Sequence, residues 1–125
     1  MKTIVISPTY NESKNIRELV QEIMLILDDV HILIVDDNSP DGTADIVRKL
    51  MLESKRVHLL LRPEKLGLGT AYCAGFKWAL DQDFDRIIQM DADMSHNPQE
   101  LPKMLEASHK ADVIIGSRYI NGVNV

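Results

Sequence analysis

Short hydrophobic runs of strand length alternate along the whole chain with segments whose hydrophobic residues recur at helical spacing. The runs occupy residues 3–7, 31–35, 57–61, 87–90 and 113–115. We expect the first strand to stop at Pro8, because proline has no N–H to donate to a neighbouring strand. The second run, HILIV, is apolar over almost its whole length, which is typical of a strand covered on both faces of a parallel sheet.

The segments between these runs predict four helices. The first has its apolar residues at helical spacing after residue 13, and we expect Asn11 or Ser13 to cap it, with Glu12 near its positive end. The others are predicted around residues 46–51, 71–79 and 98–105. Strands that alternate with helices form right-handed βαβ units. The predicted fold class is therefore α/β and doubly wound, with a mainly parallel sheet and helices on both faces.

Polar residues follow most of the predicted strands. Residues 8–12 (PTYNE) follow the first strand, Asp36 and Asp37 follow the second, residues 91–93 (DAD) follow the fourth and residues 116–118 (GSR) follow the fifth. In open parallel sheets, ligands bind outside the carboxyl ends of the strands. We therefore expect these residues to converge on one crevice.

The triplet Asp91-Ala92-Asp93 is the most informative of these segments. In extended backbone, residues two apart point to the same side, so both carboxylates can face one space. Two carboxylates held that close repel each other unless a cation or a shared proton lies between them. Hard oxygen ligands of this kind suit Mg²⁺ or Mn²⁺ completed by substrate phosphates. The structural alternative is that Asp91 only ends a strand and Asp93 only caps the next helix.

Alternation predicts that only one of the two acids after the second strand faces the crevice. We assign this role to Asp37, because an acid here commonly binds a ribose or a base in nucleotide-binding α/β folds, and we expect Asp36 to fix the turn. Residues 39–43 (SPDGT) have the residue types of a turn followed by a helix cap, and we expect only that structural role for them. On the loop after the first strand, Tyr10 could stack on a base and Glu12 could accept from a ribose or a base.

The glycine-containing segment 67–72 (GLGTAY) meets neither of the two common phosphate-loop patterns. A Rossmann fingerprint needs glycine where Tyr72 stands, and a P-loop needs a Gly-Lys-Ser/Thr string. We expect this segment to be a flexible approach to the third helix, with Lys65 near a diphosphate. Arg118 could clamp a phosphate through its planar fork, the alternative being a surface arginine.

Composition narrows the class of protein. The 125 residues fit one domain, and 14 Lys and Arg against 19 Asp and Glu leave a net charge of −5, which disfavours general nucleic-acid binding. Cys73 is the only cysteine, and we expect it to be packed inside the third helix, as we expect His31 and His58 to be structural. No hydrophobic run approaches the ~20 residues of a membrane span, and the N-terminus is not a signal peptide. These features predict a soluble intracellular domain.

Five strings together resemble inverting family-2 glycosyltransferases of the GT-A fold, with the strongest likeness to polyprenyl-phosphate and dolichyl-phosphate mannose synthases. They are SPTYNE (7–12), VDDNSPDGT (35–43), RPEKLGLGTAY (62–72), MDADMSHNP (90–98) and ADVIIGSRY (111–119). The resemblance spans nearly the whole chain and implies a Rossmann-like nucleotide-sugar-binding fold. Because members of this family continue past this point, it implies that residues 1–125 are the donor-binding catalytic domain, truncated at the acceptor side.

The resemblance also implies roles for single residues. The nucleotide-sugar pocket would be formed by Pro8, Tyr10, Glu12, Val35, Asp37, Asp91, Ala92, Asp93 and Arg118. Asp91 and Asp93 would be the catalytic DxD pair, and they would hold Mg²⁺ or Mn²⁺ together with Ser95. The acceptor side and any membrane contact would lie in parts absent from this chain.

The implied reaction is the metal-assisted transfer of a hexose, mannose from GDP-mannose, to a polyprenyl phosphate with inversion. The second pKa of a phosphate monoester is near ~6, so the acceptor is largely an ionised nucleophile at neutral pH and needs no strong general base. A metal ion on Asp91 and Asp93 would offset the charge that develops on the leaving diphosphate. The resemblance implies a cytoplasmic enzyme, at most peripheral at the cytoplasmic face of a membrane, and leaves homo-oligomer formation open.

Three alternatives remain. The chain could be a nucleotide-sugar-binding module without activity of its own, or a family-2 transferase that uses a UDP-sugar. A signalling receiver domain has this length and architecture, but it needs an aspartate at the third strand exit and a lysine at the fifth, where Arg62 and Arg118 stand.

Overall fold

The structure is a computed structural model that describes residues 2–92 and 113–115 of the chain. Its strands are β1 (Thr3–Thr9), β2 (His31–Asp36), β3 (Val57–Leu61), β4 (Arg86–Gln89) and β5 (Val113–Ile115). Its helices are α1 (Ile16–Ile26), α2 (Thr43–Glu53) and α3 (Leu68–Asp81). The fourth helix predicted from the sequence lies outside the described residues.

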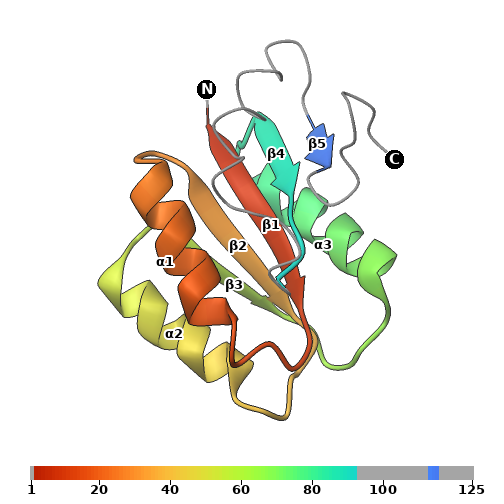
Figure 1. Cartoon of the computed structure of the whole chain (residues 1–125). Helices are drawn as coiled ribbons and strands as arrows, with labels where there is room; N and C mark the ends of the chain where they lie inside the picture. Colours follow the sequence, from red (N-terminus) through yellow and green to blue (C-terminus); the bar gives the residue numbers. More distant parts are fainter. Residues whose placement is uncertain (1, 93–112, 116–125) are drawn as a thin grey trace.

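All five strands pair in parallel, in the order β3-β2-β1-β4-β5 (Figure 1). Helices α1 and α2 cover one face of the sheet and α3 covers the other. The chain moves outward from β1 through β2 to β3 and then returns to place β4 on the opposite side of β1. The switch point of the topology therefore lies between β1 and β4, and the predicted α/β class with helices on both faces is confirmed.

Side-chain alternation along β1 divides the core into two layers. Val5 packs with α1 and α2, whereas Ile4 and Ile6 pack beneath α3. Gly75 allows α3 to approach β1 closely, because a Cβ atom at this position would lie only 2.7 Å from Cγ2 of Ile6. Helix α3 is consequently held tightly against the centre of the sheet.

The end of β1 differs from the prediction. The strand continues through Pro8 to Thr9 instead of stopping at Pro8. The carbonyl of Ile6 accepts from Met90 N, and the carbonyl of Thr9 accepts from Asp37 N, so backbone groups alternate between the two neighbouring strands. The missing N–H of Pro8 is directed to the β4 side, where pairing has already ended at Gln89, and it therefore costs no sheet hydrogen bond.

Two further expectations are corrected. Helix α1 begins at Ile16, three residues later than the Ser13 start expected, and its N-cap residue is Asn15. Asn11 and Ser13 belong to the preceding loop, where their backbone N–H groups donate to the loop after β2. Cys73 lies in α3 as expected but is exposed, since the packing face of the helix is formed by residues two positions to either side of it, Ala71 and Gly75. Within the described part of the chain, none of the helices is long and apolar enough to cross a membrane.

Candidate functional site

The loop after β1 is fastened to the loop after β2 by three successive backbone amides. The N–H groups of Asn11, Glu12 and Ser13 donate to Ser39 Oγ (2.9 Å), Thr43 Oγ1 (3.1 Å) and Asp41 Oδ2 (3.0 Å), respectively. Asn11 adopts a left-handed conformation with φ 58°, which asparagine tolerates better than most residues. Residues 39–43 therefore do more than form the turn expected of them, because they also shape the loop that presents Tyr10.

Asp41 is the charged hydrogen-bond acceptor in this contact between the two loops. Its Oδ1 accepts from the backbone N–H and the hydroxyl of Thr43, the first residue of α2, whereas the N-cap residue of that helix is Gly42. Burial acts to raise the pKa of Asp41, but the hydrogen bonds from Thr43 and Ser13 outweigh it and lower the pKa from 3.8 to about 2. The carboxylate is therefore ionised wherever the protein is folded under ordinary conditions.

The two acids after β2 have different surroundings. Asp36 is fully buried, and its carboxylate accepts from the Thr9 hydroxyl at 2.6 Å and from Ser39 through N at 2.9 Å and Oγ at 2.6 Å. The prediction that Asp36 fixes the turn is confirmed. Asp37 faces the opposite side of the sheet, toward the loop that precedes α3.

Asp37 is paired with Arg62 at the end of β3. Arg62 Nε lies 2.6 Å from Asp37 Oδ1 and Nη2 lies 2.8 Å from Oδ2, and both side chains are buried. Arg62 also donates to Thr70 Oγ1 at 3.1 Å and to the carbonyl of Gly67 at 3.4 Å. The hydrogen bonds to Asp37 raise the pKa of Arg62 despite its burial. This bidentate pair neutralises a buried acid and ties the exits of β2 and β3 to the start of α3.

A small cavity opens beside this pair at the carboxyl edge of the sheet. Its volume is about 60 Å³, and it is lined by Pro8, Thr9, Tyr10, Asp37, Lys65 and Gly67. The structure thus brings together three of the predicted nucleotide-pocket residues, Pro8, Tyr10 and Asp37. A water molecule occupies ~30 Å³ of liquid, so in this conformation the cavity holds only a few waters.

Lys65 closes one side of this cavity. Its Nζ lies 4.9 Å from the centroid of the Tyr10 ring, in the geometry of a cation–π contact. Both side chains are exposed, and Lys65 lies between Pro63 and Gly67, whose φ of 101° suits only glycine. Because an exposed contact of this kind is worth only about 0.5–1 kcal/mol, Lys65 can leave the ring at small cost.

Asp91 stands across the switch point from this cavity, two residues after the end of β4. Its side chain is partly buried, and its Oδ1 accepts a hydrogen bond of 2.8 Å from the hydroxyl of Tyr72 on α3. Ala92 is buried beside it. The other residues predicted for this side, Asp93, Ser95 and Arg118, lie outside the described residues.

The described side chains do not form a metal site by themselves. Among residues 2–92 and 113–115, no three His, Cys, Asp or Glu side chains lie close enough together to hold a metal ion. Mg²⁺ and similar ions are commonly bound by one or two carboxylates, with waters and substrate phosphates completing the shell. The Asp91 carboxylate is a hard oxygen donor at a ligand-binding edge, so it fits such an ion as one of its protein ligands.

Besides Asp91 and Ala92, which stand across the switch point, two more predicted pocket residues do not line the cavity. Val35 is fully buried beneath α3, where it packs in the cluster that contains Ile6. Glu12 directs its Oε2 to Asn15 Nδ2 at 3.2 Å, at the start of α1. Sequence reasoning also gave no role in the site to Arg62 or Tyr72, although both stand in the string RPEKLGLGTAY and contact predicted site acids.

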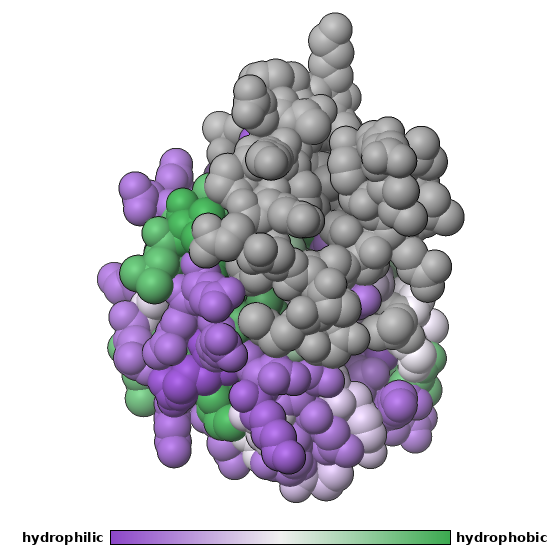
Figure 2. Space-filling view, in the orientation of Figure 1, coloured by the Kyte–Doolittle hydropathy of each residue, from purple (hydrophilic) through white to green (hydrophobic). Residues whose placement is uncertain are grey.

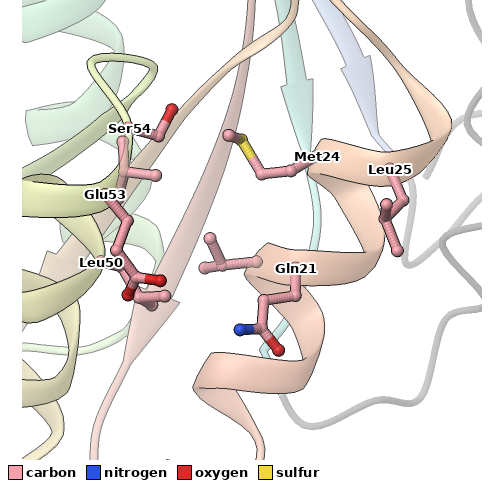
Figure 3. A pocket seen from close by; sticks show the side chains of 8 residues that line it. Gln21, Met24, Leu25, Leu50, Glu53 and Ser54 are labelled. Carbon is pink, nitrogen blue, oxygen red and sulfur yellow. The ribbon is translucent and has the colours of Figure 1, made fainter.

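Another hollow lies at the opposite end of the molecule and has a different character. It has a volume of about 380 Å³ and is lined mainly by apolar residues of α1 and α2, with Gln21 and Glu53 among them (Figure 3). Its residues come from the C-terminal parts of both helices and from the first residue of β3, which are at the amino ends of the strands. The face shown in Figure 2 is mostly hydrophilic where it is coloured, with smaller hydrophobic patches. We assign no chemistry to this hollow.

The sequence of the chain is similar to those of known glycosyltransferases. Residues 4–125 match the family described as Glycosyl transferase family 2. Polyprenol monophosphomannose synthase of Mycolicibacterium smegmatis is 47% identical over 126 residues, covering 99% of this chain and 48% of that protein. Undecaprenyl-phosphate mannosyltransferase of Micrococcus luteus is 43% identical, covering 98% of this chain and 50% of that protein. Dolichol-phosphate mannosyltransferase of Pyrococcus furiosus is 40% identical, covering 100% of this chain and 35% of that protein. The chain thus spans half or less of the length of these relatives.

Solved structures share the fold. The mannosyltransferase PcManGT from Pyrobaculum calidifontis, in complex with GDP-Man and Mn²⁺, matches with a TM-score of 0.72 and 24% identity over 88% of this chain and 33% of that one. Residues 1–349 of S. aureus TarS match with a TM-score of 0.66 and 27% identity, covering 86% of this chain and 32% of that one. These likenesses place the parallel sheet and its helices among Rossmann-like GT-A folds.

Proposed function

Because the chain belongs to glycosyl transferase family 2, we propose that it is the donor-binding part of an enzyme that transfers mannose from GDP-mannose to a polyprenyl phosphate. The observation that carries this proposal is the position of two groups of side chains. Tyr10 and Asp37 line one cavity at the carboxyl edge, and Asp91 stands across the switch point from them. A nucleoside on the side of Tyr10 and Asp37, with its diphosphate on the side of Asp91, matches the way ligands lie in such crevices.

The nucleoside occupies the side of Tyr10 and Asp37 in this proposal. Each carboxylate oxygen of Asp37 accepts one hydrogen bond from Arg62, which leaves further lone pairs for a base N–H or a ribose hydroxyl. The Tyr10 ring provides a stacking face once Lys65 has left it. Lys65 is then free to donate to the diphosphate, so that one movement both opens the cavity and brings a cation to the donor.

The diphosphate occupies the side of Asp91. We propose that Asp91 and Asp93, with Ser95, hold Mg²⁺ or Mn²⁺ there, and that Ala92 and Arg118 lie against the donor. A bound ion offsets the charge that develops on the leaving nucleoside diphosphate. The work of the chain itself is to orient the Asp91 carboxylate through Tyr72 and to offset the charge of Asp37 by pairing that acid with Arg62. PcManGT, which has the same fold, was solved with GDP-Man and Mn²⁺.

The acceptor brings its own nucleophile. A polyprenyl phosphate is largely dianionic at neutral pH, because its second pKa is near ~6, and it attacks the anomeric carbon without a protein base. Attack on the face opposite the leaving diphosphate inverts the anomeric centre. We place the acceptor lipid, any contact with the cytoplasmic face of a membrane and any oligomer contact outside the described residues.

A transfer assay tests the proposal. The chain is incubated with radiolabelled GDP-mannose, a short polyprenyl phosphate and Mn²⁺, and the lipid phase is analysed for mannosyl phosphate. The full-length synthase of M. smegmatis serves as the positive control. We expect product, or saturable Mn²⁺-dependent binding of GDP-mannose without transfer if the acceptor side is needed. Preference for UDP-sugars over GDP-mannose would favour the second family-2 alternative, and absence of both transfer and binding would reject the proposal.

A further inference from the structure

We propose that Tyr72 is a positioning residue for Asp91, whose carboxylate its hydroxyl holds in the orientation that binds the divalent ion. This inference rests on the proposed function, since that function makes Asp91 a metal ligand. Tyr72 does not contact the donor itself. Its effect on the metal is exerted through the Asp91 carboxylate.

The contact itself joins two distant parts of the chain. Tyr72 lies in the second turn of α3, and Asp91 follows β4, 19 residues later. The phenol hydroxyl donates to Oδ1 at 2.8 Å. One lone pair of Oδ1 and both lone pairs of Oδ2 remain for a cation. Carboxylates that ligate metals are commonly oriented by such an outer hydrogen bond.

The group that donates a hydrogen bond to each predicted site acid affects how much negative charge that acid can offer to a metal ion. Asp37 is held by the cation Arg62, which cancels its charge and makes it a poor ligand for a metal. Asp91 is held by a neutral hydroxyl, so the full negative charge remains for the ion. The two predicted site acids therefore have partners of different charge, and the difference matches a base-binding role for one and a metal-binding role for the other.

The tyrosine ring is held in place by the packing of α3. Gly75, one turn after Tyr72, lets the helix lie against β1 so closely that a Cβ atom would come within 2.7 Å of Ile6. At the start of the helix, Arg62 donates to Gly67 and to Thr70. The Tyr72 ring itself lies 6.5 Å, centroid to centroid, from the ring of Phe76. A side chain fixed in this way delivers its hydroxyl to a defined point.

A purely structural hydrogen bond makes a different prediction from a positioning one. If the contact only stabilises the fold, its loss lowers the thermal midpoint and weakens every ligand alike. If the contact positions a metal ligand, its loss lowers the affinity for the metal ion, while the metal-free protein binds nucleotide as before. Tyr72→Phe removes the hydroxyl alone and separates these two cases.

The test measures Mn²⁺ bound in the presence of GDP by electron paramagnetic resonance of the free ion. We expect Tyr72→Phe to raise the Kd for Mn²⁺ about tenfold, the lower end of the effect of removing outer-shell partners. Affinity for GDP in EDTA and the thermal midpoint stay near those of the wild type. The matched control is Cys73→Ser, an exposed neighbour on the same helix, which we expect to leave all three measurements unchanged.

A second variant keeps the hydroxyl and moves the helix. Gly75→Ala forces α3 and Ile6 apart, so we expect weaker Mn²⁺ binding although Tyr72 is intact. Unchanged Mn²⁺ affinity in Tyr72→Phe, or equal losses of GDP affinity with and without metal, would overturn the inference while leaving the proposed function standing. A wild-type protein that binds no Mn²⁺ with GDP would instead overturn the proposed function, and this inference with it.

Discussion

Arg62 donates to both carboxylate oxygens of Asp37, from Nε to Oδ1 at 2.6 Å and from Nη2 to Oδ2 at 2.8 Å, and the two side chains are only 10% and 7% exposed. The planar guanidinium matches the carboxylate as a fork, which lysine cannot do. The pair joins the exits of β2 and β3 at the wall of the proposed nucleotide pocket. The pair therefore affects both the stability of the protein and the position of Asp37, the acid proposed to bind the base.

Removing the arginine should be costly. Arg62→Met leaves the Asp37 carboxylate buried without a partner, and we expect a loss of about 3–5 kcal/mol in the free energy of unfolding, measured by urea denaturation. The control is Arg48→Met, which breaks an exposed pair with Asp45 and should cost less than ~1 kcal/mol. Similar small losses for both variants would show that the buried pair is not needed for the fold.

Asp41 should make stability depend on acid. Its pKa in the folded protein is about 2, against 3.8 unfolded, so the unfolded chain binds more protons between these values. The stabilisation is present above about pH 4 and is lost as the pH falls through about 2. We expect Asp41→Asn to lower the free energy of unfolding at pH 7 by about 1 kcal/mol, a modest figure because the side chain is exposed and screened.

A matched variant checks this assignment. Asp45→Asn, on the first turn of α2, removes the same charge without removing the hydrogen bonds to the loop amides. The free energy of unfolding, measured at several pH values between 2 and 7, should fall less steeply on the acid side for Asp41→Asn than for Asp45→Asn. An equally steep fall in both variants would contradict the role given to Asp41.

The stacked pair of His31 and His58 should add a second pH dependence near neutrality. Their Nδ1 and Nε2 atoms lie 2.9 Å apart, so one ring must offer an unprotonated nitrogen to the other. The pKa of His31 is lowered by burial and then by the positive charges of Lys2 and Arg56. The pKa of His58 is lowered by burial and then by the charges of His31 and Lys2. Asp85 also faces this end of the sheet through its contact with Lys2.

Protonation of the two histidines should favour the unfolded chain. Both folded pKa values lie below 6.5, so the unfolded chain takes up protons first, and stability is full above about pH 6.5 and falls as the pH drops through the folded values. We expect His58→Phe to flatten this slope in denaturation curves. A slope as steep as that of the wild type would show that the pair does not control it.

Much of the fold followed from periodicity alone, but the ends of its elements did not. The strand and helix pattern predicted the succession of elements along the chain and a mainly parallel sheet, because buried faces impose their spacing on the sequence. It did not predict the order of the strands within the sheet. The extension of β1 past Pro8 depends on which neighbour each backbone group faces, and that is known only once β4 is seen to end at Gln89. The late start of α1 depends on amides that donate to side chains 28 to 31 residues away.

The site was predictable to the extent that topology decides it. Pro8, Tyr10 and Asp37 meet because the carboxyl ends of parallel strands share one edge. Arg62 and Tyr72 were missed as partners of the site acids, since a pair 25 or 19 residues apart leaves no periodic signal. Val35 was placed in the pocket by resemblance, but its side chain alternates into the core under α3.

Lys65 should have opposite effects on two ligands. In Lys65→Ala the Tyr10 ring is already free, so we expect guanosine to bind as well as or better than in the wild type. GDP should bind about tenfold more weakly, because a charge-assisted hydrogen bond to phosphate is lost. Calorimetric titration of both ligands checks this, with the exposed Lys77→Ala on α3 as control. Equal losses for guanosine and GDP would contradict a phosphate-binding role.

Above all, we propose that the carboxyl edge of this sheet binds a nucleoside diphosphate together with a divalent ion. The most direct measurement is a calorimetric titration of GDP into the wild-type chain with Mn²⁺ and again with EDTA, repeated for Asp91→Asn. We predict saturable binding with Mn²⁺ that weakens at least about tenfold in EDTA and by a similar factor in Asp91→Asn. Binding of neither GDP nor UDP, or binding that is indifferent both to the metal and to Asp91, would contradict the claim.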